Sequence, residues 1–144
     1  MEPRSNPGEL KPALELATSA LARRDFSEQG LRERLARAGV GPDEAEEAIG
    51  RLRHAGVVDD RRFAGDRARA LAERGKGDAA IRFDLERQGV AAEQIDEALA
   101  ALEPERKRAE RIVAHRGASP TTARLLANRG FDVDAVEAAV ASSA

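Results

Sequence analysis

The chain has 144 residues, no cysteine and a formal net charge of −2, with 42% hydrophobic and 35% charged residues. The absence of cysteine excludes a disulfide framework and a thiolate metal site, and no stretch approaches the roughly 18 apolar residues of a membrane-spanning helix. Only 3% of the residues are aromatic, so Ala, Leu, Val and Ile have to form a thin, tightly packed core. The first residues lack the apolar run of a signal peptide. We therefore expect a cytoplasmic protein without membrane contact.

A first triplet of helices is predicted after a segment that lacks hydrophobic periodicity. Pro, Gly, Asn and Ser are frequent at the start of the chain, so the sequence predicts a disordered tail over residues 1–11. A first helix is expected from about Pro12 to Arg24. Ser27 is a good N-cap for a second helix. A third helix is expected to begin at Pro42, because proline suits the first helical position.

Two further triplets are predicted. Asp59 is expected to cap the first helix of the second triplet, and its other helices are predicted over about 78–88 and 92–102. In the third triplet, the second helix is expected to start at Ser119, and Asp132 is expected to cap the last. The three repeats are predicted to span residues 12–58, 59–103 and 104–144.

Three short segments repeat one pattern: LARAGV at 35–40, LERQGV at 85–90 and LANRGF at 126–131. In each segment a leucine is followed four residues later by glycine and then by an apolar residue. The glycines are 50 and 41 residues apart, a period typical of stacked helical repeats. Glycine after a helix adopts a left-handed conformation without steric cost, and the next apolar residue can pack onto the last turn. Since no segment alternates as a strand does, the sequence predicts an all-α protein of three tandem three-helix repeats.

Candidates for catalysis or metal binding are weak. His54 and His115 lie far apart and lack ligand spacing, so surface or helix-end positions are expected for both. Asp59 and Asp60 could hold a metal, but a capping role explains them with fewer assumptions. The basic RGKG stretch at 74–77 could contact phosphate, although it lacks the spacing of a P-loop and follows no strand. We therefore expect no enzyme activity, no metal site and no cofactor.

Charge is distributed unevenly along the repeats. The charged residues within 41–50, 92–105 and 132–144 are all acidic, whereas 51–76 contains eight basic and four acidic residues. Stacking of the repeats could gather the basic side chains on a face apart from the carboxylates, where a partner could bind despite the negative total. The alternative is that Arg and Glu are merely solvated and form pairs along each helix.

Similarity to a known family extends over three longer stretches: ALARRDFSEQGLRERLARAGV at 20–40, VVDDRRFAGDRARALAERGKGDAAIRFDLERQGV at 57–90 and LLANRGFDVDAVEAAV at 125–140. Together they resemble the RecX family of recombination regulators, and ARRDFSE, DDRRFA and RGKG are fairly specific in this order. The resemblance implies an elongated, curved array of three-helix repeats. It also implies a protein that binds RecA recombinase filaments, inhibits their ATPase and strand exchange, and so modulates recombinational DNA repair and the SOS response.

The resemblance further implies where a partner binds. Phe63 lies within one motif but is expected to be a core residue. The sequence departs from the family at Val57-Val58, where an aromatic residue is common, and at 78–80, where proline and basic residues are common. These departures argue against direct DNA binding through the second helix of the middle repeat. The basic side chains of the motifs and of the adjoining segment are expected to form the partner-binding or DNA-binding site: Arg23, Arg24, Arg61, Arg62, Arg67, Arg74, Lys76, Arg82 and Arg87.

The predicted function is that of a monomeric, stoichiometric modulator. Its arginines would pair with carboxylates or phosphates of a RecA filament on single-stranded DNA. One alternative is a sequence-independent DNA-binding helical module without a recombinase partner, although the net acidity and the lack of Tyr and Trp count against it. The other alternative is a helical-repeat adaptor for an unrelated protein.

Overall fold

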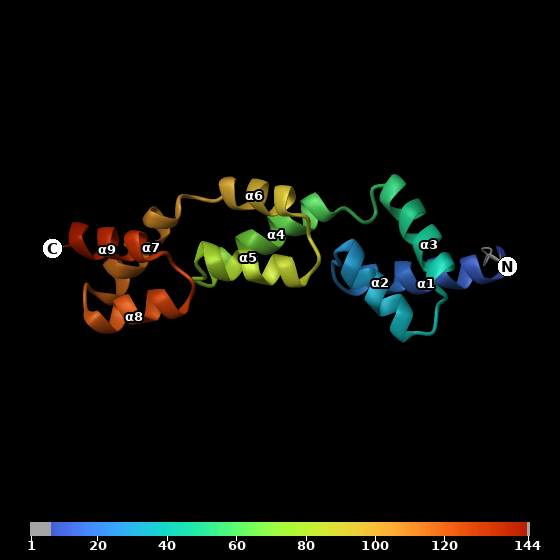
Figure 1. The fold of residues 1–144 in the computed structure, drawn as a ribbon, viewed down its shortest axis with the longest axis horizontal. Helices are drawn as coiled ribbons and strands as arrows, with labels where there is room; N and C mark the ends of the chain where they lie inside the picture. The colour runs from blue at the N-terminus through green and yellow to red at the C-terminus, as the bar shows by residue number, and fades with distance from the viewer. Residues whose placement is uncertain (1–6, 144) are drawn as a thin grey trace. The chain divides into compact units, whose positions relative to one another are not determined.

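The computed structural model describes residues 7–143, which fold into helices without any β-strand (Figure 1). The all-α prediction is therefore confirmed, and the helices follow one another in triplets joined by short connections. No helix of this part of the chain is both long and apolar enough to cross a membrane. The helices are α1 (Pro7–Arg23), α2 (Glu28–Arg37), α3 (Pro42–His54), α4 (Asp60–Glu73), α5 (Asp78–Arg87), α6 (Ala92–Ala100), α7 (Glu105–Arg116), α8 (Pro120–Asn128) and α9 (Val133–Ser142).

The three triplets are distributed over two compact units. The first unit contains the described residues up to Phe63 together with Gln88–Val90. The second unit contains Ala64–Arg87 and the residues from Ala91 onward. The boundary falls within α4, so compactness alone does not delimit the three repeats, and their predicted boundaries stay a prediction.

The first triplet packs around a core to which all three helices contribute. α1, α2 and α3 contact one another, and Val58 adds an apolar side chain from the connection that leads to α4. Small residues from α1 and α3 let the helices approach closely, as expected for a chain with few aromatic residues. The buried cluster consists of Ala17, Phe26, Leu31, Leu35, Ala45, Ile49, Leu52 and Val58.

The start of α1 differs from the prediction. The helix begins at Pro7 rather than at about Pro12, so the predicted disorder is wrong for residues 7–11, while residues 1–6 lie outside the described part. Leu10 is buried with Ala13 and Ala48. The additional turn of α1 is therefore stabilised by burial of the Leu10 side chain. A prediction based on Pro and Gly content does not detect this contact.

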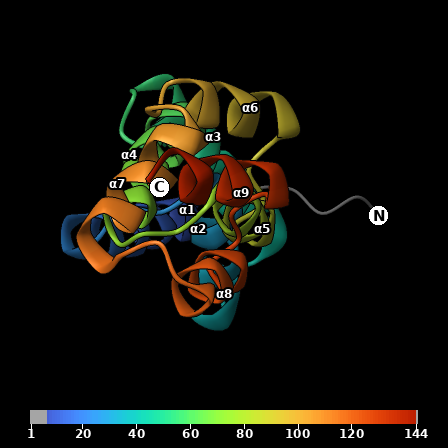
Figure 2. The same cartoon turned by 90° about the vertical axis from the view of Figure 1, so that its left-hand side faces the viewer.

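The third triplet has a core of its own. α9 lies beside α7, and α8 packs against both (Figure 2). In the second triplet α5 packs against α6, and an ion pair between Arg67 and Asp84 joins α4 to α5. The buried cluster of the third triplet consists of Ala109, Val113, Leu126, Phe131, Val136 and Ala139.

The three repeated glycines end helices, as predicted. Gly39, Gly89 and Gly130 have φ angles of 84°, 76° and 90°, in the left-handed region that glycine tolerates. After α2 the Val40 amide donates to the Leu35 carbonyl at 3.0 Å, the long bond of a Schellman motif, and the turn after α8 makes the equivalent bond. The LARAGV pattern is therefore a helix stop.

The predicted N-caps are also confirmed. The Ser27 hydroxyl accepts a hydrogen bond from the Gly30 amide at 3.0 Å, and Ser119 and Asp132 accept equivalent bonds at the starts of α8 and α9. Asp59 accepts from the amide of Arg62 at 3.1 Å. Asp59 thus caps α4, as the capping interpretation predicts.

The N-terminal end of α2 packs against the turn that contains Gln88. The fully buried Ser27 donates its hydroxyl proton to the Gln88 carbonyl at 2.6 Å. The Glu28 amide donates to the carboxylate of Asp60, at the start of α4, at 2.8 Å. Burial raises the pKa of Asp60, which the bond from the Glu28 amide opposes. The first triplet is thus joined to residues of the second repeat by hydrogen bonds.

The N-terminal end of α5 makes an equivalent contact with the turn after α8. The Gly77 amide donates to the Arg129 carbonyl at 2.8 Å, and the Asp78 amide donates to the carboxylate of Glu105, at the start of α7, at 2.6 Å. Gly77 and Arg129 correspond to the partners in the first contact by the periods of 50 and 41 residues. Because Gly77 has no side chain, its backbone makes the bond that the hydroxyl makes at Ser27.

The outer helices depart from this contact. Glu28 and Asp78 are the first residues of α2 and α5, and each donates its amide proton to a carboxylate. The first residue of α8 is Pro120, which has no amide N–H and cannot donate in this way. In α1, the position 50 residues before Asp60 is occupied by the buried Leu10. Neither residue can form the hydrogen bond by which the repeats are joined.

Ser27→Ala should destabilise the protein more than Ser119→Ala. Both serines are N-caps, whose loss costs about 1 kcal/mol, but only Ser27 also bonds to a turn of the next repeat. We expect the free energy of unfolding to fall by about 2 kcal/mol for Ser27→Ala and about 1 kcal/mol for Ser119→Ala, measured by urea denaturation. Equal losses would show that the Gln88 bond contributes nothing.

Candidate partner-binding site

Part of the basic charge is neutralised within each repeat. Arg32 of α2 forms an ion pair with Glu46 of α3, and Arg82 of α5 pairs with Asp96 of α6 at 2.6 Å. The two pairs lie 50 residues apart. A hydrogen bond to Arg32 lowers the pKa of Glu46. The prediction that basic side chains gather apart from the carboxylates of the third helices is wrong for these residues, because the second and third helices of each repeat pack together.

Two other predicted site residues have structural contacts. Arg62 donates to the carbonyl oxygens of Gly56 and Val57 at 3.1 Å each and so satisfies the connection that follows α3. Arg67 is paired with Asp84. The guanidinium groups of Arg62 and Arg67 are therefore engaged by the fold, which makes them poor candidates for a partner-binding role.

A basic pocket of about 500 Å³ lies on the first unit, at the end of α1. Arg23, Arg24 and Arg62 line it, together with Asp25 and Val57. The Arg24 guanidinium lies 4.2 Å from the ring centroid of the neighbouring Phe26, a cation–π contact that orients the side chain. The nearby Arg61 is exposed on α4. The structure thus brings three of the predicted residues together in one pocket of the first unit.

A second basic pocket, of about 250 Å³, lies on the second unit. Arg74 lines it from the end of α4, and Arg111, Arg116 and Arg129 line it from the third triplet. Only Arg74 belongs to the predicted set. Arg116 and Arg129 escaped the prediction because the family motifs do not mark them, although each immediately precedes a glycine that ends a helix.

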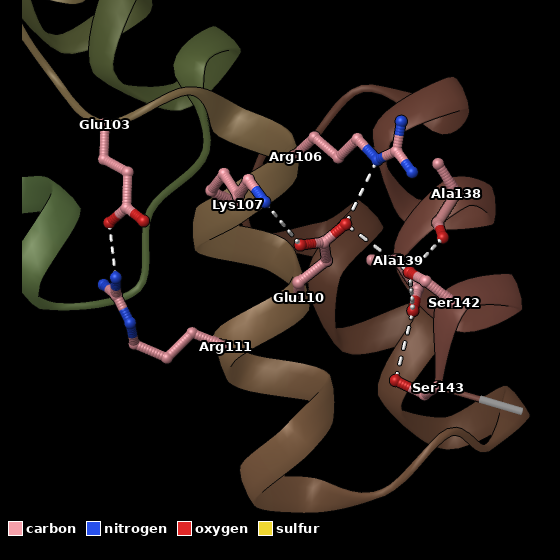
Figure 3. Close-up of polar contacts among 9 residues, drawn as sticks. All are labelled: Glu103, Arg106, Lys107, Glu110, Arg111, Ala138, Ala139, Ser142 and Ser143. Atoms are coloured by element: carbon pink, nitrogen blue, oxygen red, sulfur yellow. Dashed lines mark hydrogen bonds and ion pairs between the residues drawn. The ribbon is translucent and has the colours of Figure 1, made fainter.

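Carboxylates neutralise some basic side chains near this second pocket. Glu103 forms an ion pair with Arg111, and Glu110 pairs with both Arg106 and Lys107 (Figure 3). These contacts lie along α7 and the connection before it. Arg111 therefore lines the second pocket with a positive charge that Glu103 neutralises.

Two further residues of the predicted set lie on exposed surface. Lys76 follows the end of α4, and Arg87 lies near the end of α5. The Arg87 guanidinium is 5.8 Å from the ring centroid of Phe83, a residue that is 62% exposed. Phe63, in contrast, is buried, as predicted.

The RGKG stretch has a structural explanation. Gly75 has a φ of 83° and ends α4, where the Lys76 amide donates to the Leu71 carbonyl at 3.0 Å. Gly77 makes the contact with the turn after α8 described above. Within residues 7–143 no three His, Cys, Asp or Glu side chains are placed to hold a metal ion. The two glycines are therefore explained by helix termination and close backbone packing.

Family models match two of the triplets. The model of the first three-helix domain of RecX matches residues 13–52, and that of the second matches residues 59–99. The regulatory protein RecX of Chromohalobacter salexigens is 37% identical over 134 residues, which cover 87% of this chain and 88% of that protein. The chain belongs to the RecX family. The regulatory protein RecX of Halorhodospira halophila is 34% identical over 137 residues, with 88% and 85% covered.

Solved structures agree with the helical-repeat fold of the RecX family. The crystal structure of RecX from Lactobacillus salivarius superposes with a TM-score of 0.81, covering 95% of this chain and 97% of that one. Its sequence identity is 15%, so the match concerns the fold alone. The fold is therefore retained although most residues differ, and the surface of this chain has to be interpreted from its own side chains.

Proposed function

We propose that this protein is a monomeric, cytoplasmic regulator that binds RecA recombinase filaments and inhibits their ATP hydrolysis and strand exchange. By this activity it modulates recombinational DNA repair and the SOS response. Membership of the RecX family, whose relatives above are named regulatory proteins, is the observation that carries the proposal. The exposed basic residues around the two pockets supply donors for carboxylates or phosphates on such a filament.

The direct test is the ATPase activity of RecA on single-stranded DNA, measured while the purified protein is titrated in. We expect hydrolysis to decline and to reach a plateau as filament sites fill, because a stoichiometric binder acts in proportion to the bound fraction. Strand exchange should decline over the same concentration range. Unchanged ATPase activity at saturating protein would exclude the proposed function.

A charge-reversal pair identifies the surface involved. Arg74→Glu combined with Lys76→Glu changes two exposed side chains that have no hydrogen-bonding partner in residues 7–143, so the fold should persist. We expect the concentration that half-inhibits RecA ATPase to rise about 10-fold, as the loss of charge-assisted contacts implies. Arg34→Glu with Arg37→Glu, on the exposed side of α2, is the control with the same charge change. An equal loss in the control would mean that net charge, and not this surface, determines inhibition.

A DNA-binding module without a recombinase partner is the second candidate. The four arginines of the second pocket favour it, because a basic concavity attracts a polyanion. This candidate predicts that the protein binds single-stranded DNA. It also predicts that RecA ATPase activity declines only to the extent that the two proteins compete for that DNA. Excess DNA would then abolish any inhibition.

A further inference from the structure

The second pocket contains three arginines that no carboxylate neutralises. Arg74, Arg116 and Arg129 line it from the ends of α4, α7 and α8, and none of their guanidinium groups forms an ion pair or hydrogen bond in the described part of the chain. The neighbouring Arg111, in contrast, is paired with Glu103. Glu73 is the single acidic residue that lines the pocket. Three unpaired guanidinium groups at one place repel one another, and a bound anion would relieve this repulsion.

Gly75 allows Arg129 to lie against the end of α4. A Cβ atom built on Gly75 would be 2.7 Å from the Arg129 Nη1 atom and 3.8 Å from the Ile112 side chain. A larger residue at position 75 would therefore displace the guanidinium. The absence of a side chain at Gly75 therefore leaves the space that the Arg129 guanidinium occupies, in a pocket that Ile112 also lines.

The donors of these arginines are not used to cap α4. The Schellman turn provides its own bonds, from the Gly75 amide to the Ala72 carbonyl at 2.9 Å and from the Lys76 amide to the Leu71 carbonyl at 3.0 Å. The negative ends of the helix dipoles attract nearby cations, but each is equivalent to only about half a charge. The pocket consequently retains positive charge and free N–H groups.

We propose that this pocket binds a phosphate group of a single-stranded DNA backbone. A carboxylate is satisfied by one guanidinium fork, whereas phosphate oxygens can accept donors from several directions. The open pocket of about 250 Å³ has room for a phosphate and the adjoining sugar. The proposal deepens the proposed function, on which its choice of single-stranded DNA rests, by giving the protein its own contact with the DNA of the filament.

The test measures binding of the full chain to fluorescently labelled oligothymidylate by anisotropy, without RecA and at several salt concentrations. For Arg116→Gln combined with Arg129→Gln, we expect affinity to fall about 10-fold or more. The slope of log K against log salt should become shallower by about 1.4, since each lost contact with single-stranded DNA removes about 0.7. Arg34→Gln with Arg37→Gln removes the same charge from two exposed arginines of α2 whose side chains have no partner within residues 7–143, and should change both quantities little.

The outcomes separate this proposal from the proposed function. Equal losses in the two double variants, or no binding of oligothymidylate by the wild type, would overturn the phosphate site even if RecA ATPase is still inhibited. Loss of RecA inhibition with unchanged DNA binding would also overturn it, because the pocket would then bind acidic protein side chains. Circular dichroism and urea denaturation check folding. If the double variant is unfolded, Arg74→Gln, on a different helix end, tests the same pocket.

Discussion

Gly130→Ala should lower the free energy of unfolding by about 3 kcal/mol, whereas Gly39→Ala should lower it by about 1 kcal/mol. Both glycines end a second helix in a left-handed conformation, with φ angles of 90° and 84°, so alanine has the same backbone cost at each. A Cβ atom at Gly130 would lie 2.6 Å from both the Cβ and the amide nitrogen of Ala80. A Cβ atom at Gly39 would have no atom of residues 7–143 within 4 Å apart from those of its chain neighbours.

The difference between the two substitutions therefore measures the packing of α5 on the turn after α8. Urea denaturation of both variants gives the difference directly, and the denaturant dependence should be unchanged if both remain two-state. Gly50→Ala is a second control, because this glycine lies within α3 with open space around it, and alanine there should stabilise the protein by about 0.5 kcal/mol. Equal losses at Gly39 and Gly130 would mean that the turn can move away from Ala80 at little cost.

Local structure was predictable from the sequence because it depends on neighbours along the chain. Ser27, Asp59, Ser119 and Asp132 cap helices through side-chain bonds to amides two or three residues away. The left-handed glycines, such as Gly39, likewise follow from the end of an apolar periodicity. The repeat was visible for the same reason, since equivalent positions carry equivalent local roles.

The contacts between repeats could not be predicted in the same way. Ser27 and Gly77 occupy equivalent positions and bind equivalent carbonyl groups, one through a hydroxyl and the other through its amide. Sequence comparison treats this substitution as a loss of similarity. The equivalence appears only in the structure, where the Gly77 amide and the Ser27 hydroxyl each donate to the carbonyl group of a turn.

The candidate site was predicted in part. Arg23, Arg24 and Arg74 line pockets, as basic residues of the motifs would if they bind a partner. For Arg82 a partner-binding role stays a prediction, and its pairing with Asp96 was not predictable because it depends on how α5 packs against α6. Arg116 and Arg129 were missed, since residues from three helix ends meet at the second pocket and no single stretch of sequence contains them.

Asp78→Ala should lower the free energy of unfolding by about 3 kcal/mol, because it leaves a buried guanidinium group without its partner. The Nη1 and Nη2 atoms of Arg108 both donate to Asp78 Oδ1, at 2.9 and 2.6 Å. The Arg108 side chain is 8% exposed, and its Nε atom has no acceptor among the residues that the structure describes. Water therefore has little access to the donors that the substitution would leave unpaired.

Asp78→Asn should cost less than about 1 kcal/mol, because the amide oxygen can accept both bonds. Burial raises the pKa of Asp78 above its ordinary value of 3.8, while Arg108 opposes this. The folded protein then binds this proton more tightly than the unfolded chain does, so this group makes folding less favourable as the pH rises from 3.8 through the raised value. The asparagine variant lacks that contribution. Its free energy of unfolding relative to wild type should therefore increase as the pH rises over the same interval, which urea denaturation at several pH values measures.

Arg106→Ala is the matched control for the loss of an ion pair on α7. Its pair with Glu110 is exposed, with 61% of the arginine side chain accessible (Figure 3), and such pairs contribute about 0.5 kcal/mol or less. If Asp78→Ala lowered the free energy of unfolding as little as this control, water or a rearranged side chain would have to accept the hydrogen bonds of Arg108. The Asp78–Arg108 pair would then not stabilise the contact between the start of α5 and α7. A large loss with alanine and a small one with asparagine would show instead that the accepting oxygen, more than the negative charge, stabilises the joint between the second and third repeats.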